Sequence, residues 1–354
     1  MICPHCEKNL LHRERVRGTC PKCKRAFALE PKDNPLRLHD VRMRKLIWKL
    51  GNGEGLRYTP VQLWYAAARN RTPVKGTSYG CVGAFLTAVI SAVSLVIIAV
   101  TRFDPAIMVF VLVGAVLLTA LLLRMTVRAA RRAKWTGTVR VPMAFEHFRT
   151  SVIDRWTRVY GAPPPGLTDE SGLRFPIGPD GRPPKLVLLC PDRTVLAFLA
   201  LNGAHRRHPL ALAQSVDQLG TISTGTAGEP APVGIVLHDA SPAGLAFASA
   251  ARSALGGRVV VAGMLPRTVM DRTTALRLRK PLVAGDLEAI RTASALTEAE
   301  ADWLSRGWWS PIAAVPPAKL LAVLDRAVDR AEGIADPDRG RAQQVGFLTW
   351  PTAS

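Results

Sequence analysis

Residues 185–202, with the sequence KLVLLCPDRTVLAFLALN, decide the fold class of the C-terminal part of this chain. The apolar run 185–190 is typical of a buried strand, and residues 194–202 follow it with the spacing of a helix. The same alternation returns further along, in a strand over 233–238, a helix over 243–255 and a strand over 258–262. Short apolar strands separated by helices predict a parallel α/β sheet, Rossmann-like in the broad sense, over residues 185–332.

The end of the chain has helical patterns. Thr297 and Glu300 have the spacing of a capping box, in which each side chain bonds the backbone of the other residue. A further helix is expected over 316–332, because its apolar residues fall on one face. The last residues, 333–354, are expected to be a disordered tail. The α/β domain is therefore expected to end near residue 332.

One segment of this domain resembles a known family. Residues 238–244, His-Asp-Ala-Ser-Pro-Ala-Gly, follow an apolar strand and open a helix. They resemble the second acidic motif of Toprim domains, as in the A subunit of topoisomerase VI, and residues 190–193, Cys-Pro-Asp-Arg, take the place of the first motif. The resemblance implies a metal-dependent nuclease, in which several carboxylates hold Mg²⁺ against a phosphodiester.

The carboxylates of that chemistry are mostly replaced in this chain. Cys190 stands where the family has a glutamate, and the paired aspartates have become Asp239-Ala240-Ser241. Asp192 and Asp239 are the candidate catalytic residues that remain, although one or two carboxylates hold Mg²⁺ poorly without substrate phosphates. The alternative is that Asp239 caps the helix that starts near Pro242. The sequence therefore favours a degenerate Toprim-like domain that acts as a binding module.

Two CxxC pairs lie near the N-terminus, Cys3 with Cys6 and Cys20 with Cys23. The tight turn of each pair directs two sulfurs to one ion, and four thiolates complete a tetrahedral Zn²⁺ site. So short a segment cannot bury enough apolar surface to fold alone, and the metal would supply the missing free energy. The spacing resembles a zinc ribbon over residues 1–35, with these four cysteines as ligands of a structural Zn²⁺.

Residues 36–80 are predicted to form a basic helical segment beside a membrane. Thr59 followed by Pro60 is typical of a helix start. The glycine-rich turn 51–55 lacks a Walker lysine and follows no strand, so a flexible turn is expected there and no phosphate loop. The expected first helix carries four cations, Arg42, Arg44, Lys45 and Lys49.

Two long apolar runs, 81–100 and 106–123, contain no charged residue. Each is long enough to cross a hydrocarbon core of about 30 Å, so a transmembrane helical hairpin is predicted over 81–123. Basic residues flank the hairpin on both sides, which predicts a multi-pass protein of the cell (inner) membrane with both termini cytoplasmic. A buried soluble hairpin is the alternative. The combination resembles zinc-ribbon membrane proteins of actinobacterial type.

Residues 124–184 are expected to hold a basic flank, an amphipathic helix and a linker. Phe148, Val152 and Trp156 recur at helical spacing within 144–160, which indicates either core packing or a binding groove. The stretch 161–184 is rich in Pro and Gly, as linkers and loops are.

The charge of the chain is strongly positive, with 47 Lys and Arg against 27 Asp and Glu and a net charge of +20. The excess lies in residues 1–140, while residues 141–354 are close to balanced. Such a field suits anionic lipid headgroups or nucleic acid. Six cysteines in 354 residues, four of them in CxxC pairs, do not indicate a disulfide scaffold.

The function that the sequence favours is a membrane-anchored, non-enzymatic adaptor. It would present the zinc ribbon and the α/β domain to a cytoplasmic protein partner, such as a defence complex or a contractile injection particle, although no residue specifies that partner. Two alternatives stay open, a nucleic-acid-binding protein and a Toprim-like metal-dependent nuclease. The chain contains no HExxH or Walker A motif that would point to another enzyme class.

Overall fold

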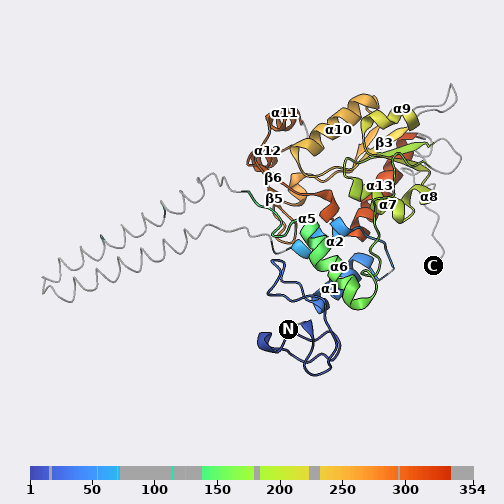
Figure 1. Cartoon of the computed structure of the whole chain (residues 1–354). Coiled ribbons are helices and arrows are strands. Elements are labelled where there is room, and N and C mark those ends of the chain that lie inside the picture. Colours follow the sequence, from blue (N-terminus) through green and yellow to red (C-terminus); the bar gives the residue numbers. More distant parts are fainter. Residues whose placement is uncertain are drawn as a thin grey trace, which may run out of the picture. The chain divides into compact units, whose positions relative to one another are not determined.

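The computed structural model describes residues 1–15, 18–53, 55–69, 71, 114, 124, 138–178, 184–222, 232–293 and 296–335 (Figure 1). The chain divides into two compact units, one that joins residues 1–72 with 138–354 and one that spans 73–137. Almost all of the described residues belong to the first unit, which contains both the cysteine pairs and the α/β domain.

A four-stranded parallel sheet forms the centre of the α/β domain. Its strands are β1 (Leu186–Leu189), β2 (Leu210–Ala213), β3 (Val233–Val236) and β4 (Val259–Val261), in the order β2-β1-β3-β4. Every residue of β1, β2 and β3 is buried, as is typical of a parallel sheet covered on both faces. The predicted parallel α/β sheet is confirmed, and β2 is a strand that the sequence analysis did not find.

Helices cover both faces of this sheet. The helices are α7 (Arg193–Leu201), α8 (Ala204–Arg207), α9 (Leu219–Ile222), α10 (Pro242–Ala254) and α13 (Pro317–Ala335). Leu186 and Leu188 belong to a core cluster with α7 and α13, whereas Val187 and Leu189 belong to a cluster with α10. Because neighbouring residues of β1 enter different clusters, α7 and α13 lie on one face and α10 on the other.

A small antiparallel pair and two helices extend the domain beyond β4. The pair is β5 (Leu278–Arg279) with β6 (Trp308–Trp309), and the helices are α11 (Ala284–Thr292) and α12 (Glu298–Ser305). Thr297 is the N-cap of α12 and forms the predicted capping box with Glu300. A 3₁₀ helix, η6 (Ile312–Ala314), then leads into α13.

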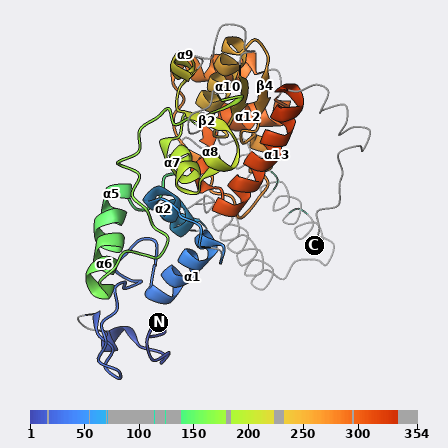
Figure 2. The same ribbon diagram turned by 90° about the vertical axis from the view of Figure 1, so that its right-hand side faces the viewer.

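A second core is built by helices from two separate parts of the sequence. It joins α1 (Asp40–Gly51) and α2 (Pro60–Ala68) with α5 (Phe145–Phe148), a π-helical turn (Arg149–Ile153) and α6 (Asp154–Tyr160) (Figure 2). Phe148, Val152 and Trp156 are all buried in it, so the apolar stripe of residues 144–160 packs into a core. Thr59 is the N-cap of α2, with Pro60 at its first position, as predicted. Gly53 and Gly55 have positive φ in the turn after α1, which agrees with the expected turn.

The segment predicted to be a linker makes backbone contacts with both cores. Leu167 pairs with Tyr58 next to α2, and Ile177 pairs with Leu212 in β2. Asn202 at the end of α7 binds the backbone N–H and C=O of Arg57 with its side-chain amide, at 3.0 and 2.9 Å. Residues far apart in the sequence therefore join the N-terminal helices to the α/β domain.

The membrane predictions are corrected by the structure. Within the described residues, no helix is long and apolar enough to cross a membrane. A span needs about 20 predominantly apolar residues, and the longest described helix, α13, has 19 and carries charged residues such as Asp325, Arg326 and Asp329. The transmembrane hairpin of the expected fold, its multi-pass localisation and the cytoplasmic placement of the termini are therefore not upheld. The predicted spans themselves, 81–100 and 106–123, lie outside the described residues apart from Gly114.

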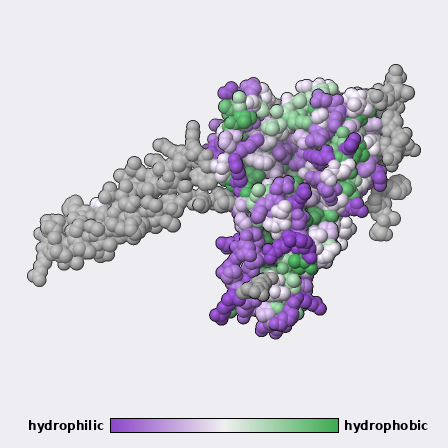
Figure 3. All heavy atoms as spheres, in the orientation of Figure 1, coloured by the Kyte–Doolittle hydropathy of each residue, from purple (hydrophilic) through white to green (hydrophobic). Residues whose placement is uncertain are grey.

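The surface of the described part is mixed in polarity. Figure 3 shows hydrophilic residues over much of the face in view, with small hydrophobic patches between them. The large apolar side chains that are exposed are scattered along the chain: Ile2, Leu11, Trp48, Val283, Leu287 and Ile334. Single exposed apolar residues are normal on protein surfaces. Trp48 is the most exposed of them, at 69%, and it lies on the basic helix α1.

Candidate functional site

The four N-terminal cysteines converge on one point. The ligand atoms of Cys3, Cys6, Cys20 and Cys23 all lie within 4.8 Å of one another, and the sulfurs of Cys3 and Cys23 are 3.8 Å apart, as are those of Cys6 and Cys20. Thiolates held about 2.3 Å from a tetrahedral ion lie about 3.8 Å from each other. The four thiols could therefore hold one metal ion between them.

Two matching turns place the sulfurs. The N–H of Glu7 donates to the carbonyl of Cys3 and the N–H of Lys24 donates to that of Cys20, at 3.1 and 2.9 Å. Glu7 and Lys24 both adopt positive φ, 58° and 59°, the conformation that a chain needs to close such a tight turn. A backbone N–H of Cys23 also lowers the pKa of the Cys20 thiol to about 7, and the thiolate is the form that binds metals.

A buried carboxylate fixes this ribbon to the helices. Asp40 is fully buried at the first position of α1, and its oxygens accept the backbone N–H groups of Ala28 and Leu29 at 2.8 and 2.7 Å. The hydroxyl of Tyr160, the last residue of α6, also donates to Asp40. Arg44 of α1 also reaches the ribbon and donates to the carbonyl of Pro4 at 2.9 Å. The sequence does not single out Asp40, because an acidic residue at a helix start resembles an ordinary surface charge.

The second group of candidate residues lies at the carboxyl edge of the parallel sheet. The strand order reverses between β1 and β3, and open α/β sheets bind their ligands in the crevice at such a switch point. Cys190 and Asp192 follow β1, and His238 and Asp239 follow β3. The structure thus places both candidate carboxylates, Asp192 and Asp239, at the switch point.

Both carboxylates accept backbone hydrogen bonds there. Asp192 is the N-cap of α7 and accepts from Thr194 and Val195 at 2.9 and 3.4 Å. Asp239 accepts from the backbone N–H of Ile312 in η6 at 2.7 Å. The expectation that Asp239 caps the next helix is wrong, because the side chain of Ser241 is the N-cap of α10. Asp239 instead ties β3 to a segment 73 residues further along the chain.

The chain itself covers this crevice. Tyr65 of α2 packs against the core of the sheet, and burial together with the charges of Asp192 and Asp239 raises the pKa of its hydroxyl. Residues 310–312 lie over the end of β3, where Ser310 pairs with Ala240. The site where a doubly wound fold usually binds its ligand is therefore occupied by α2 and η6.

Burial dominates the electrostatics of the crevice. It raises the pKa of Asp239 to about 7, although the N–H of Ile312 favours the charged form. Burial also raises the pKa of Asp192 and of the Cys190 thiol. Cys190 is fully buried, and a thiol with a raised pKa is a poor nucleophile and a poor metal ligand.

Comparison with known proteins does not identify a relative. No family model, no curated protein and no solved structure matches the chain. The zinc-ribbon and Toprim resemblances are thus neither confirmed nor refuted.

Proposed function

We propose that this protein is a non-enzymatic adaptor, a binding protein whose N-terminal ribbon is held together by a structural zinc ion. The observation that carries the proposal is the filled crevice at the switch point. The two carboxylates there accept backbone N–H groups, and Tyr65 and Ile312 take the space that a substrate would need. An enzyme of the Toprim-like class needs these carboxylates free to hold a cation against a phosphodiester.

Zinc is the metal that best fits the cysteine cluster. Four thiolates complete its coordination and leave no position for water or substrate, as in structural zinc sites. The same donor set also suits iron, so the metal must be identified directly. Elemental analysis of the purified full-length protein should give one zinc per chain, and iron would be visible by its absorption.

An adaptor and a nuclease predict different outcomes in one set of assays. The full-length protein is incubated with single- and double-stranded DNA and RNA in the presence of Mg²⁺ or Mn²⁺, next to the Asp239→Asn variant. The adaptor proposal predicts no cleavage by either protein. Metal-dependent cleavage that the folded Asp239→Asn protein lacks would overturn the proposal and establish the nuclease.

The adaptor proposal also requires that a partner binds through the metal-bound ribbon or the α/β domain. Crosslinking in cells that express the wild type, Cys6→Ser or Asp192→Asn separates these roles. A partner held by the ribbon is lost with Cys6→Ser and is kept with Asp192→Asn, which leaves the ribbon intact. If the same set of crosslinked proteins is recovered from all three strains and from a strain that lacks this protein, no specific partner exists and the adaptor proposal fails.

A further inference from the structure

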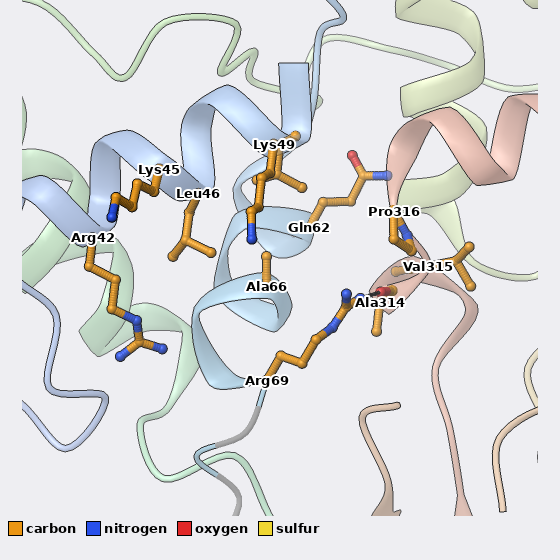
Figure 4. A pocket seen from close by; sticks show the side chains of 12 residues that line it. Arg42, Lys45, Leu46, Lys49, Gln62, Ala66, Arg69, Ala314, Val315 and Pro316 are labelled. Atoms are coloured by element: carbon orange, nitrogen blue, oxygen red, sulfur yellow. Dashed lines mark hydrogen bonds between the residues drawn. The ribbon is translucent and has the colours of Figure 1, made fainter. Parts of the chain in front are cut away.

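A pocket of about 440 Å³ lies where the N-terminal helices meet the segment that leads into α13. It is bounded by α1, α2 and residues 313–316 (Figure 4). Pockets that bind small molecules usually enclose about 300–1,000 Å³, so this one has room for a small organic molecule. Its apolar wall is formed by Leu46, Leu50, Ala66, Val315 and Pro316.

The charged side chains that line the pocket are all cations. Three belong to α1 and one follows α2: Arg42, Lys45, Lys49 and Arg69. Among the described residues of the lining there is no Asp or Glu, and in the described part of the chain none of the four cations takes part in an ion pair. Asp40, the only acidic residue of α1, binds the ribbon instead. Like charges around one hollow create a field that favours an anion.

Gln62 of α2 lines the pocket with an amide group whose orientation the fold decides. Its side chain is only 2% exposed, and Oε1 accepts the backbone N–H of Thr59 at 3.1 Å in the capping box of α2. Because the oxygen is used in this way, Nε2 is the free end of the amide, and it has no hydrogen-bond partner among the described residues. In Figure 4 the side chain extends from α2 toward the segment that holds Pro316. Leaving a buried donor unpaired is destabilising, so an acceptor in the pocket would remove that cost.

Arg69 provides a second unpaired donor. One terminal N–H of its guanidinium donates to the carbonyl of Ala314, which fixes the side chain in the wall of the pocket, whereas its buried Nε has no partner among the described residues. Burial lowers the pKa of Arg69, as expected for a charge that is withdrawn from water. Arg42 differs, because it donates to the carbonyls of Leu36 and Ala67 at 2.6 and 3.0 Å. A partly desolvated guanidinium with a free N–H gains most from an anionic acceptor.

These donors fit a phosphate group better than a carboxylate. They come from α1 and α2, two different walls of the pocket, so the ligand must accept hydrogen bonds from several directions. A phosphate monoester offers three acceptor oxygens and nearly two negative charges at neutral pH, whereas a carboxylate offers two oxygens in one plane and a single charge.

We infer that this pocket binds a phosphate monoester of a small organic molecule. The phosphate lies against Gln62, Arg69 and the lysines of α1, and the organic part lies against the apolar wall. This adds a ligand to the adaptor, and it rests on different residues from the carboxylates of the crevice.

The test measures binding of the full-length protein to phenyl phosphate and to inorganic phosphate by isothermal titration calorimetry at constant ionic strength. Phenyl phosphate carries the phosphate on an apolar ring, and benzoate, with the same ring and a carboxylate, is the matched comparison. The wild type should bind phenyl phosphate more tightly than inorganic phosphate, because the ring buries apolar surface. Benzoate should bind at least about tenfold more weakly than phenyl phosphate, because it carries less charge and fewer acceptors.

Gln62→Glu changes the free end of the amide and keeps the cap. Glutamate forms a capping box as well as glutamine does, so α2 should still start at Thr59. The free end of the side chain becomes a carboxylate oxygen, which repels a phosphate and can pair with Arg69 in its place. The variant should be at least as stable as the wild type without ligand and should bind phenyl phosphate more weakly by on the order of a hundredfold. Unchanged binding would assign Gln62 to the cap alone and overturn the inference.

Lys49→Gln tests the charge of α1 without a change to a buried group. Lys49 is exposed, so the variant should keep the thermal stability of the wild type, and binding of phenyl phosphate should weaken by about tenfold. Arg252→Gln is the matched control. It removes one positive charge from an exposed position of α10, a helix that does not line this pocket, and should leave binding unchanged.

Three further results would overturn the inference. The first is an equal loss of binding with Lys49→Gln and Arg252→Gln, which would indicate only an effect of net charge. The second is binding of benzoate that is as tight as that of phenyl phosphate. The third is an absence of binding to both soluble phosphates, including the case in which only vesicles that contain phosphatidic acid are bound. Each of these results leaves the adaptor proposal intact, since that proposal depends on the crevice and on the lack of cleavage.

Discussion

The cysteine cluster and the carboxyl edge of the sheet are made of residues that often bind metals, yet the structure uses them in opposite ways. The four thiols of the ribbon point at one another, with sulfurs 3.8 Å apart. The carboxylates of Asp192 and Asp239 point at backbone N–H groups of α7 and η6. Residue type therefore marks a possible metal ligand, whereas the direction of its donor atoms decides whether it can act as one.

The largest effect is expected from a substitution in the cysteine cluster. Cys6→Ser removes one of four ligands, and a structural zinc site contributes on the order of 10 kcal/mol to the folding of such a small segment. We expect the variant to lose its metal and the fold of its ribbon, measured by elemental analysis and by limited proteolysis of the N-terminus. Cys190→Ala is the matched control, because this buried thiol lies in the sheet core and should keep the metal content of the wild type. A Cys6→Ser protein with full metal content would show that the cluster is not the site.

Asp40→Ala tests whether the ribbon is held by its metal alone. The substitution leaves the N–H groups of Ala28 and Leu29 buried without an acceptor, so we expect a loss of roughly 2–4 kcal/mol in the free energy of unfolding. The metal content should stay the same, since no ligand is touched. Chemical denaturation with elemental analysis on the same samples checks both points. Loss of metal with Asp40→Ala would mean that docking and metal binding are one event.

Asp239→Asn tests the role of the carboxylate at the edge of the sheet through the pH dependence of the protein's stability. The pKa of Asp239 is raised from 3.8 to about 7 in the folded state, so the folded protein holds this proton more tightly than the unfolded chain. This group therefore stabilises the fold fully below about pH 4, and that contribution is lost as the pH rises to 7. Asparagine resembles the protonated acid and can still accept from Ile312.

The expected result is a difference in the free energy of unfolding between variant and wild type, and this difference grows with pH. The two should be similarly stable at pH 4, and Asp239→Asn should be more stable at pH 8 by roughly 1–3 kcal/mol. Urea denaturation of both proteins from pH 4 to 8 measures this difference. The cysteines titrate in both proteins alike, so their contribution cancels when the two are compared. A variant that is less stable than the wild type at pH 8 would show that Asp239 needs its charge, as a cation ligand does.

Substitution of Asp192 is expected to change the stability of the fold least. As the N-cap of α7 it should lose about 1 kcal/mol of stability on substitution by Ala and only a few tenths on substitution by Asn, which caps about as well. Thermal denaturation of both variants measures the difference. Equal losses for the two substitutions would mean that the negative charge of Asp192, rather than its capping bond, is what the fold requires.

Local signals explain which elements the sequence predicted well. β1, β3 and β4, the N-caps Thr59 and Thr297, and the apolar face of α13 were all predicted within a few residues. Each depends on residues adjacent in the chain. β2 was missed because Leu and Ala alternate in it and both favour helices, so only its pairing with β1 makes it a strand.

The amino-acid sequence by itself determined the cysteine site and the parallel α/β sheet. The spacing of a CxxC pair directs its two sulfurs toward one ion. The alternation of apolar strands with helices leaves few arrangements that bury the strands and the apolar faces of the helices. The roles of Asp40 and Asp239, by contrast, depend on tertiary contacts. Asp40 meets the ribbon, Asp239 meets Ile312, and α2 covers the switch point. The backbone N–H groups that these two carboxylates bind lie 11 to 73 residues away in the chain. Whether a carboxylate meets a cation or a backbone N–H depends on the segment that packs against it. A local sequence pattern does not contain that information.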